Sequence, residues 1–294
     1  LRLLDYRIGV SDAMVDLLIS RGFDPDKLFT IYNGIDFTLP APAMSRAEYF
    51  RSVGLQADED SVVVGIAARL NPVKDISTLI RGFAKAHETC PQLRLLIAGD
   101  GEERSMLEDL ARELGVADTV CFAGWISDTN TFYQSIDINT LTSLSETFPY
   151  ALTEGARASL PTVSSRVGGV PYLIDHGVNG LLFEPGDAEG LAHHLITLAQ
   201  DPVQRQHLGE RLRQKGVEEY SLESTIERQL GIYRTILRRK ERERTVGRRD
   251  GALVCGAYGR GNAGDDAILE AIVTELRQID PDLPIWVLSR NPAD

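Results

Sequence analysis

The chain has 294 residues, of which 43% are hydrophobic and 25% are charged, proportions typical of a globular protein rather than a disordered one. Its formal net charge of −12 argues against a general nucleic-acid binder, so no nucleic-acid partner is expected. No apolar run approaches the roughly 18 residues that a membrane span needs.

The first part of the chain, residues 1–36, is predicted to form a strand, a helix, a second strand and a turn. Ser11 is placed to cap the helix. Gly34 in the turn is expected to supply an unusual backbone angle. The sequence starts as though cut from a longer protein, and Asp294 falls inside a predicted βα unit, so we expect the chain to be incomplete.

Short apolar strands alternate with helices without interruption in the middle of the chain. This alternation predicts parallel strands buried on both faces, which is a doubly wound α/β sheet of the Rossmann-like kind. Ligands of such sheets bind beyond the carboxyl ends of the strands. The predicted strands are Val62–Ala67, Leu93–Ala98, Val120–Phe122, Ile136–Leu141, Thr162–Ser164 and Leu181–Phe183.

Two cations follow the first of these strands. Arg69 and Lys74 lie five positions apart in a loop between a buried strand and a helix, and from there both can contact one diphosphate. When a sugar–phosphate bond breaks, negative charge grows on the leaving diphosphate, so fixed cations stabilise the transition state more than the ground state. On spacing alone, a pair of solvated loop charges is an equally good interpretation.

Two carboxylates, Glu146 and Glu154, bracket a predicted helix start at which Pro149 is expected to be the first helical residue. The backbone N–H groups of Thr147, Phe148 and Tyr150 are then expected to point out of the helix N-terminus, where a partly negative ligand is favoured. Such a site accepts hydroxyls on carboxylates and phosphate or sugar oxygens on amides, which suits a nucleotide sugar. Taken singly, each glutamate is more often an ordinary surface carboxylate.

Several ordered motifs resemble those of family-four glycosyltransferases, which have the GT-B fold. The motifs are Ala68-Arg-Leu-Asn-Pro-Val-Lys-Asp75, Gly99-Asp-Gly101, Phe122-Ala-Gly-Trp125, Ser145-Glu-Thr-Phe-Pro149 with Glu154, Val167-Gly-Gly-Val-Pro171 and Asn179-Gly-Leu-Leu-Phe183. The resemblance covers roughly residues 1–240. It implies retaining transfer of a sugar from a nucleotide-diphosphate donor to a glycan or lipid-linked acceptor, with no essential metal and no other cofactor.

The resemblance also implies which residues bind the phosphates and the ribose. Arg69 and Lys74 would hold the diphosphate, and Glu154 would take the ribose hydroxyls. Together with Glu146, the two cations are the expected catalytic residues.

The donor sugar and the base would be held by a second group of residues. Glu146, with the amides of Thr147 and Phe148, would hold the sugar. The backbone near Trp125 and Ile126 would lie along the edge of the base. Without the resemblance, Trp125 is more simply interpreted as a core aromatic residue.

Four parts are predicted along the chain. Residues 1–36 would be the last elements of an amino-terminal acceptor lobe with its hinge, and residues 37–240 the nucleotide-sugar-binding lobe. Residues 241–250 would form a basic linker, and residues 251–294 a truncated βαβ unit. The glycine loop and the histidine of the acceptor lobe are missing, and Tyr172 stands where the family often has glutamate. Weak or absent transfer by this chain is therefore expected.

The segment Arg234–Arg249 carries eight basic residues against two acidic ones. A solvated helix end followed by a linker accounts for it, and the sharper interpretation is a patch that docks on anionic lipid headgroups or on a polyanionic acceptor. The three cysteines are isolated, without the spacing of a disulfide framework or a zinc site. We expect a cytoplasmic protein, with peripheral contact to the cytoplasmic face of a membrane as the alternative.

The tail resembles the opening of polysaccharide pyruvyl transferases, through the motif Cys255-Gly-Ala-Tyr-Gly-Arg-Gly-Asn-Ala-Gly-Asp-Asp-Ala-Ile-Leu-Glu270. That resemblance implies pyruvyl transfer from phosphoenolpyruvate and a fusion of two enzymes of polysaccharide biosynthesis. Three functions stay open from the sequence. They are a glycosyltransferase of cell-surface polysaccharide biosynthesis, an inert nucleotide-sugar-binding module, and a fusion whose main activity is pyruvyl transfer.

Overall fold

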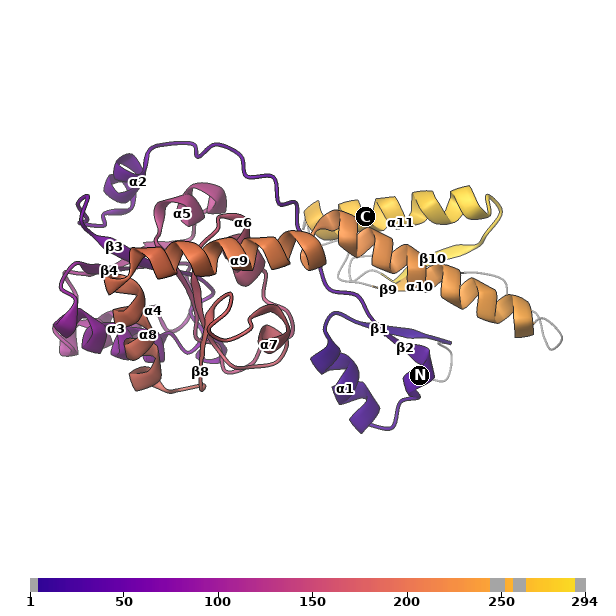
Figure 1. The fold of residues 1–294 in the computed structure, drawn as a ribbon, viewed down its shortest axis with the longest axis horizontal. Coiled ribbons are helices and arrows are strands. Elements are labelled where there is room, and N and C mark those ends of the chain that lie inside the picture. The colour runs from indigo at the N-terminus through magenta and orange to yellow at the C-terminus, as the bar shows by residue number, and fades with distance from the viewer. Residues whose placement is uncertain (1–4, 244–251, 256–262, 289–294) are drawn as a thin grey trace. The chain divides into compact units, whose positions relative to one another are not determined.

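The structure is a computed structural model that describes residues 5–243, 252–255 and 263–288 (Figure 1). The chain divides into two compact units. The first is formed by Leu1–Thr30 and Phe37–Glu218, and the second by Ile31–Asp36 and Glu219–Asp294. The four-part division expected from the sequence stays a prediction.

A six-stranded parallel sheet lies at the centre of the first unit, in the order β5-β4-β3-β6-β7-β8. Runs of β-branched and other apolar residues form the central strands β3 and β4 because both faces of the sheet are covered and most of their positions are buried. The predicted doubly wound α/β sheet is therefore confirmed. The strands are β3 (Val62–Ala67), β4 (Leu93–Ala98), β5 (Val120–Gly124), β6 (Ile138–Leu141), β7 (Thr162–Ser165) and β8 (Leu181–Phe183).

Helices cover both faces of this sheet (Figure 1). Alternate residues of β3 contribute to different core clusters, with Val62, Val64 and Ile66 on one face and Val63 on the other. The first face is covered by α3 (Ile76–Thr89), α4 (Arg104–Glu113) and α8 (Ala188–Gln200), and the second by α2 (Arg46–Val53) and α5 (Thr129–Ser135). The other helices of this unit are α1 (Asp12–Ser20), α6 (Tyr150–Arg157), α7 (Val170–Leu173) and α9 (Pro202–Tyr220).

The direction of the strand crossovers reverses between β3 and β6. From β3 the chain runs to β4 and to β5 at one edge, returns to β6 beside β3, and continues to β7 and to β8 at the other edge. Gly65 of β3 pairs with Asn139 of β6, and the Thr140 hydroxyl donates a hydrogen bond of 2.9 Å to the Gly65 carbonyl. Open α/β sheets bind their ligands where such a reversal occurs, at the carboxyl ends of the two strands. We call these strand ends, with the loops that follow them, the switch point.

At the start of the chain, β1 (Arg7–Gly9) pairs in parallel with β2 (Leu28–Thr30), and α1 connects the two strands. The side chain of Ser11 accepts a hydrogen bond from the Met14 backbone N–H, which confirms the predicted helix cap.

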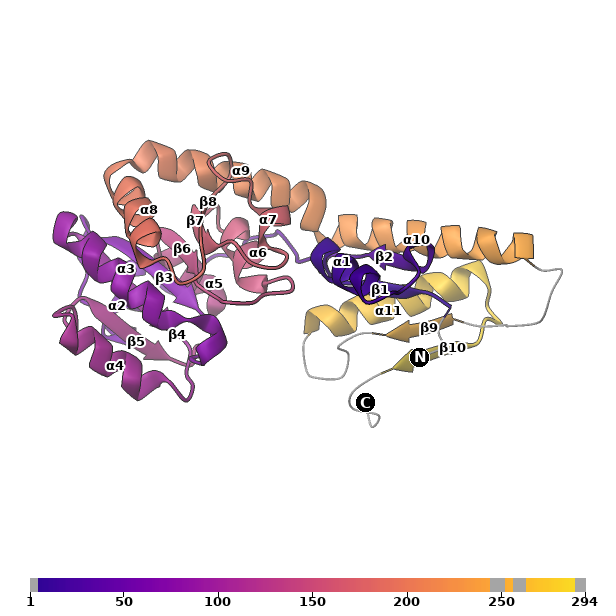
Figure 2. The ribbon, with the colours of Figure 1, turned by 90° about the horizontal axis from the view of Figure 1, so that it is seen from below.

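The second unit contains α10 (Leu222–Glu243), β9 (Ala252–Cys255), α11 (Ala263–Ile279) and β10 (Ile285–Leu288). Figure 2 shows β9 and β10 side by side, and they pair in parallel, as the predicted partial βαβ unit requires. Val254, Ile268, Ile272 and Leu276 form its small core. The glycine-rich loop of residues 256–262 and most of the linker of residues 241–250 lie outside the described residues. No helix in the described ranges is long and apolar enough to cross a membrane.

Gly34 also belongs to the second unit, and the expectation about its backbone angle is wrong. It is not among the glycines with positive φ. A Cβ added there would lie 2.4 Å from the hydroxyl of Thr225 and 2.5 Å from the carbonyl oxygen of Ser221. Glycine is required at this position because residues 31–36 approach the start of α10 closely.

Candidate functional site

Lys74 and Glu146 meet at the switch point. Lys74 lies in the loop after β3 and Glu146 in the loop after β6, and the Lys74 Nζ donates a hydrogen bond of 2.5 Å to Glu146 Oε1. The Ser143 hydroxyl donates to the same oxygen at 2.6 Å. The side chains of the pair are only 26% and 11% exposed, so solvent screens their attraction less than it would on an open surface.

The two loops are joined to each other by hydrogen bonds to backbone carbonyls. The side chain of Asn71 accepts from the Lys74 N–H at 3.2 Å and so shapes the first loop. The Thr142 hydroxyl then donates to the Lys74 carbonyl, and the Leu144 N–H donates to the Val73 carbonyl, both at 2.8 Å. The positions of Lys74 and Glu146 are therefore set by hydrogen bonds of the loop backbones as well as by their own ion pair.

A third loop, which follows β7, packs directly on the backbone beside Glu146. Gly168 has a φ of +49°, and a Cβ added there would lie 1.6 Å from the Glu146 carbonyl oxygen. At Gly169 the added Cβ would lie 2.2 Å from the carbonyl oxygen of Thr147. Only glycines allow this approach, so the Gly-Gly pair fixes the position of the segment that carries Glu146.

Arg69 lies in the same loop as Lys74, but its guanidinium approaches a different carboxylate. The side chain is 72% exposed, and its Nη2 lies 3.6 Å from Oε2 of Glu102, in the loop after β4. That loop packs closely on the loop after β3, because a Cβ added at Gly101 would lie 2.1 Å from the Leu70 carbonyl oxygen. Arg69 is thus an open cation that borders the switch point without joining the Lys74–Glu146 pair.

Glu154 lies in α6 and is half-buried. Burial raises the pKa of its carboxyl group, whereas the nearby Arg157 lowers it. Tyr133 and Thr129, both in α5, also lower the pKa by interacting with the charged form. The groups that act on the Glu154 carboxyl group thus include side chains of α5.

The start of α6 differs from the prediction by one position. The first helical residue is Tyr150, and Pro149 is the N-cap with an extended backbone, φ −82° and ψ 120°. Thr147 is exposed and Phe148 is buried, and both precede the cap. The first helical turn thus begins at Tyr150, and amide contacts from Thr147 and Phe148 to a ligand stay a prediction.

Trp125 is 83% exposed at the carboxyl end of β5, so its interpretation as a core aromatic residue is wrong. The turn that places it outside begins at Gly124, whose φ is +71°. Ile126 packs against the core cluster under α2 and α5. The contact of this backbone with a base stays a prediction.

Three residues that sequence reasoning missed contact the predicted site, namely Ser143, Glu102 and Tyr133. Ser143 lies three positions before Glu146 in one polar loop, and that spacing is a usable signal. Glu102 directly follows the Gly99-Asp-Gly101 motif, and that position next to a predicted strand end is also a usable signal. No sequence signal pointed to Tyr133, because an aromatic residue in a helix between buried strands normally belongs to the core.

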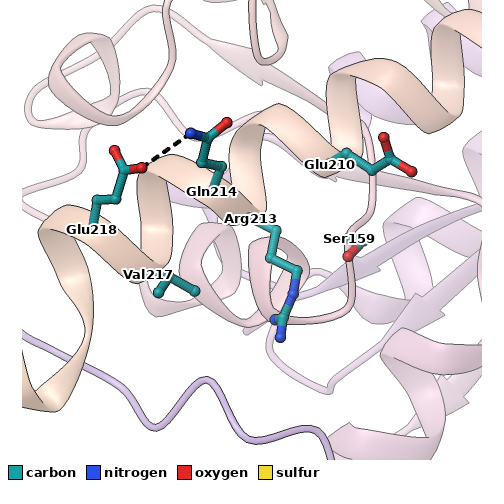
Figure 3. Close-up of a pocket in the computed structure, with 6 residues that line it drawn as sticks. All are labelled: Ser159, Glu210, Arg213, Gln214, Val217 and Glu218. Atoms are coloured by element: carbon teal, nitrogen blue, oxygen red, sulfur yellow. Dashed lines mark hydrogen bonds between the residues drawn. The ribbon is translucent and has the colours of Figure 1, made fainter.

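The structure has a surface pocket of about 420 Å³ along α9 (Figure 3). The Arg213 guanidinium in it donates to the carbonyls of Phe37 and Arg157, at 3.4 and 3.1 Å. The Gln214 amide donates to the Glu218 carboxylate at 3.0 Å. These polar groups are engaged within the protein, and none of the predicted site residues is in the described lining. The lining consists of Ser159, Glu210, Arg213, Gln214, Val217 and Glu218.

Within the described ranges, no three histidine, cysteine, aspartate or glutamate side chains are grouped as metal ligands could be. The expectation that no metal is needed stays a prediction.

A comparison with known families identifies the lobe that carries this site. The family model for glycosyl transferases group 1 matches residues 50–215, which include the switch point and all of the predicted site residues. The chain belongs to this family.

Among the relatives of this group 1 glycosyltransferase, an uncharacterized glycosyltransferase of Methanocaldococcus jannaschii is 32% identical over 214 residues, 71% of this chain and 54% of the relative. The D-inositol 3-phosphate glycosyltransferase of Thermobifida fusca is 30% identical over 243 residues, 78% of this chain and again 54% of the relative. The chain thus spans about half the length of these relatives.

Solved structures agree with the family. HepE of Anabaena, in complex with UDP-glucose, is 26% identical and superposes with a TM-score of 0.71, over 80% of this chain and 64% of HepE. The resemblance to GT-B glycosyltransferases is therefore confirmed. The pyruvyl transferase resemblance of the tail stays a prediction.

Proposed function

We propose that the switch point of this glycosyltransferase binds a nucleotide-diphosphate sugar and that the sugar is transferred with retention. The observation that carries the proposal is the shielded Lys74–Glu146 pair, in which a cation and a carboxylate from adjacent strand ends are fixed by three interlocked loops. The relative HepE has been solved with UDP and with UDP-glucose, which supports this class of donor.

The two cations would act on the leaving group. In the transfer, the bond between the sugar C1 and the diphosphate oxygen breaks, and its electron pair stays on the diphosphate. Lys74 and Arg69 would neutralise that growing charge. Lys74 is already oriented by its loop, so it would lose little conformational freedom on binding, whereas Arg69 is open and can close on the phosphates.

Glu146 would accept hydrogen bonds from hydroxyls of the donor sugar. The Ser143 hydroxyl occupies one side of its Oε1, which keeps the carboxylate in one orientation. The amides of Thr147 and Phe148 would add donors on the sugar side.

At the other end of the donor, Glu154 would accept the ribose hydroxyls, and the backbone at Trp125 and Ile126 would border the base. No metal and no other cofactor takes part in this proposal. The only small molecule that it requires is the nucleotide-diphosphate sugar itself.

The proposed acceptor is a glycan or a lipid-linked glycan of cell-surface polysaccharide biosynthesis. The lipopolysaccharide core biosynthesis glycosyltransferase LpsE of Rhizobium meliloti is 35% identical over 170 residues, 58% of this chain and 49% of LpsE, and supports this class. We further propose that the reaction takes place in the cytoplasm, with the basic segment at the end of α10 as a peripheral contact to the cytoplasmic face of a membrane.

A thermal-shift panel tests the donor proposal directly. UDP, GDP and their glucose and mannose conjugates are each titrated into the chain, and at least one is expected to raise its melting temperature in a saturable way. The proposal fails if every member of the panel leaves melting unchanged. Binding without donor hydrolysis or transfer would instead identify an inert binding module. Binding of phosphoenolpyruvate by the complete polypeptide would favour the fused pyruvyl transferase.

Glu102 competes with the diphosphate for Arg69, so Glu102→Gln is expected to tighten nucleoside diphosphate binding. Exposed ion pairs contribute at most about 1 kcal/mol, which limits the gain to about fivefold. Asp109→Asn is the matched control, because it removes the same charge from an exposed ion pair with Arg112 in α4. Calorimetric titration of both variants measures the change, and equal affinity for the two would contradict the competition.

A further inference from the structure

Two histidines bind the backbone of a single residue in β8. Within the described residues, β8 is the last strand of the six-stranded sheet, and β7 is its neighbour. An edge strand presents backbone groups that have no further strand to pair with. At Leu182 both groups are taken by histidines. Its N–H donates to Nδ1 of His176 at 2.9 Å, and its carbonyl oxygen lies 3.2 Å from Nε2 of His194. The two rings have a centroid distance of 5.6 Å.

The direction of these hydrogen bonds fixes the protonation state of His176. A backbone N–H can only donate, so Nδ1 of His176 must accept and carries no proton. A carbonyl oxygen can only accept, so Nε2 of His194 must donate, and it can do so in the neutral and in the charged ring. Protonation of Nδ1 therefore breaks the bond from Leu182 to His176, whereas the bond from His194 survives acid.

The charged groups around the two rings come from the loop, from α8 and from α9. Burial lowers the pKa of His194, the carbonyl of Leu182 raises it, and a positive charge on His176 lowers it again. β8 itself is apolar and adds no charge. The other titratable groups are His193 and Asp187, which act on His194, and Asp175, which is paired with Lys215 of α9 at 2.8 Å.

His176 is exposed and lies in the loop between α7 and β8. Asn179, which is only 3% exposed, holds this loop together from inside. Its Nδ2 donates to the Leu173 carbonyl at 3.1 Å, and its Oδ1 accepts from the Asp175 N–H at 2.7 Å. These bonds lie within the loop and its start, whereas the bond from Leu182 to His176 joins the loop to the edge of the sheet.

The same loop is connected to the switch point through α7. This short helix directly follows Gly168 and Gly169, which pack on the carbonyl oxygens of Glu146 and Thr147. The loop, α7 and the Gly-Gly pair are thus consecutive parts of one segment. A change in the position of the loop is therefore expected to reach the backbone that carries Glu146.

We propose that His176 is an acid-sensitive latch. Its neutral ring holds the loop of residues 174–180 on the edge of β8, and its protonation releases that loop and weakens donor binding at the switch point. The effect on the donor rests on the proposed function. The latch bond needs a neutral ring, so it is complete above the pH range in which histidine side chains ordinarily titrate, around pH 6.5, and is lost as the pH falls through that range.

Hydrogen exchange of the Leu182 amide, followed by NMR, tests the latch without a ligand. In wild type its protection, corrected for the intrinsic pH dependence of exchange, is expected to fall about fivefold from about pH 7.5 to about pH 5. His176→Asn is expected to keep its protection, because the amide oxygen can accept in place of Nδ1 and does not titrate. His176→Leu has no acceptor and is expected to show low protection at both pH values.

Two further variants show which ring responds. His207→Asn removes an exposed histidine of α9, and His194→Gln keeps a donor for the Leu182 carbonyl but cannot take up a proton. Both are expected to show the same acid-induced fall in protection as wild type. Constant protection in wild type, or an equal fall in His176→Asn, would overturn the latch.

Calorimetric titration with UDP and GDP at the same two pH values tests the effect on the donor. Affinity is expected to fall about threefold more in wild type than in His176→Asn, because the coupling cannot exceed the about fivefold change at the latch itself. Phosphate groups also titrate in this range, but equally for both proteins. An equal fall in affinity overturns the regulation of the switch point. If neither nucleotide binds at either pH, the proposed function is wrong, and the exchange experiment still decides the latch.

Discussion

Lys74→Ala is expected to abolish the rise in melting temperature that nucleoside diphosphates give the wild-type chain. The lysine would contact the diphosphate through charge-assisted hydrogen bonds of about 1.5–3 kcal/mol, so its loss weakens binding more than about tenfold. The variant also leaves Glu146, which is 11% exposed, without its cation. An unpaired group of this kind lowers the free energy of unfolding by about 1–3 kcal/mol.

The chain provides a matched control for this variant. Lys85 in α3 is also paired with a glutamate, Glu189, but lies in a more open position on a helix. Lys85→Ala is therefore expected to keep the full ligand-induced shift. Direct titration at a temperature where both variants are folded separates affinity from stability. Undiminished affinity of Lys74→Ala for the diphosphate would remove Lys74 from the site.

Among glycine-to-alanine substitutions in the lobe, Gly168→Ala is expected to lower the free energy of unfolding the most. A residue other than glycine at φ +49° costs about 1–2 kcal/mol. The added carbon would also lie 1.6 Å from the Glu146 carbonyl oxygen, and relieving such overpacking typically costs a further 1–3 kcal/mol, by the same rough accounting. Since the backbone that must move carries Glu146, we expect donor binding to fall together with the free energy of unfolding.

Comparison with Gly177→Ala separates the steric part of that loss of stability from the part that is due to the backbone angle. Gly177 has a φ of +79°, and nothing lies within 4 Å of a Cβ added there. The variant therefore carries the backbone penalty without the contact. Chemical denaturation and nucleotide titration of both variants are expected to show a larger loss of stability for Gly168→Ala and a loss of affinity for it alone. Equal behaviour would mean that the contact with Glu146 does not hold the site.

Much of the fold could be predicted because each buried strand is indicated by its own short run of apolar residues. The runs Val62–Ala67 and Leu93–Ala98 are apolar throughout, as strands buried on both faces must be, and they form β3 and β4 at the expected residues. The order of the strands could not be predicted in this way. No local pattern indicates that β6 returns to lie beside β3, and that return creates the switch point.

The site was predictable in its residues but less so in its contacts. Lys74 and Glu146 were both identified, yet their direct hydrogen bond depends on two loops from separate strands. The exposure of Trp125 depends on the turn at Gly124. Pro149 is the N-cap because its ψ is extended, which the ψ of a first helical residue cannot be. Tyr133 was missed because its effect on the Glu154 carboxyl group depends on one polar atom in a side chain that otherwise packs as core.

The pairing of β3 with β6 also affects how this protein folds. The Val63 N–H donates to the Asp137 carboxylate across 74 residues of sequence, and the β3–β6 ladder has a similar separation. Contacts of such length carry a large loop-closure entropy and form slowly. The segments that carry Lys74 and Glu146 are therefore expected to meet late, after β3 and β4 have paired. Substitutions in these segments should accelerate unfolding while leaving the refolding rate almost unchanged.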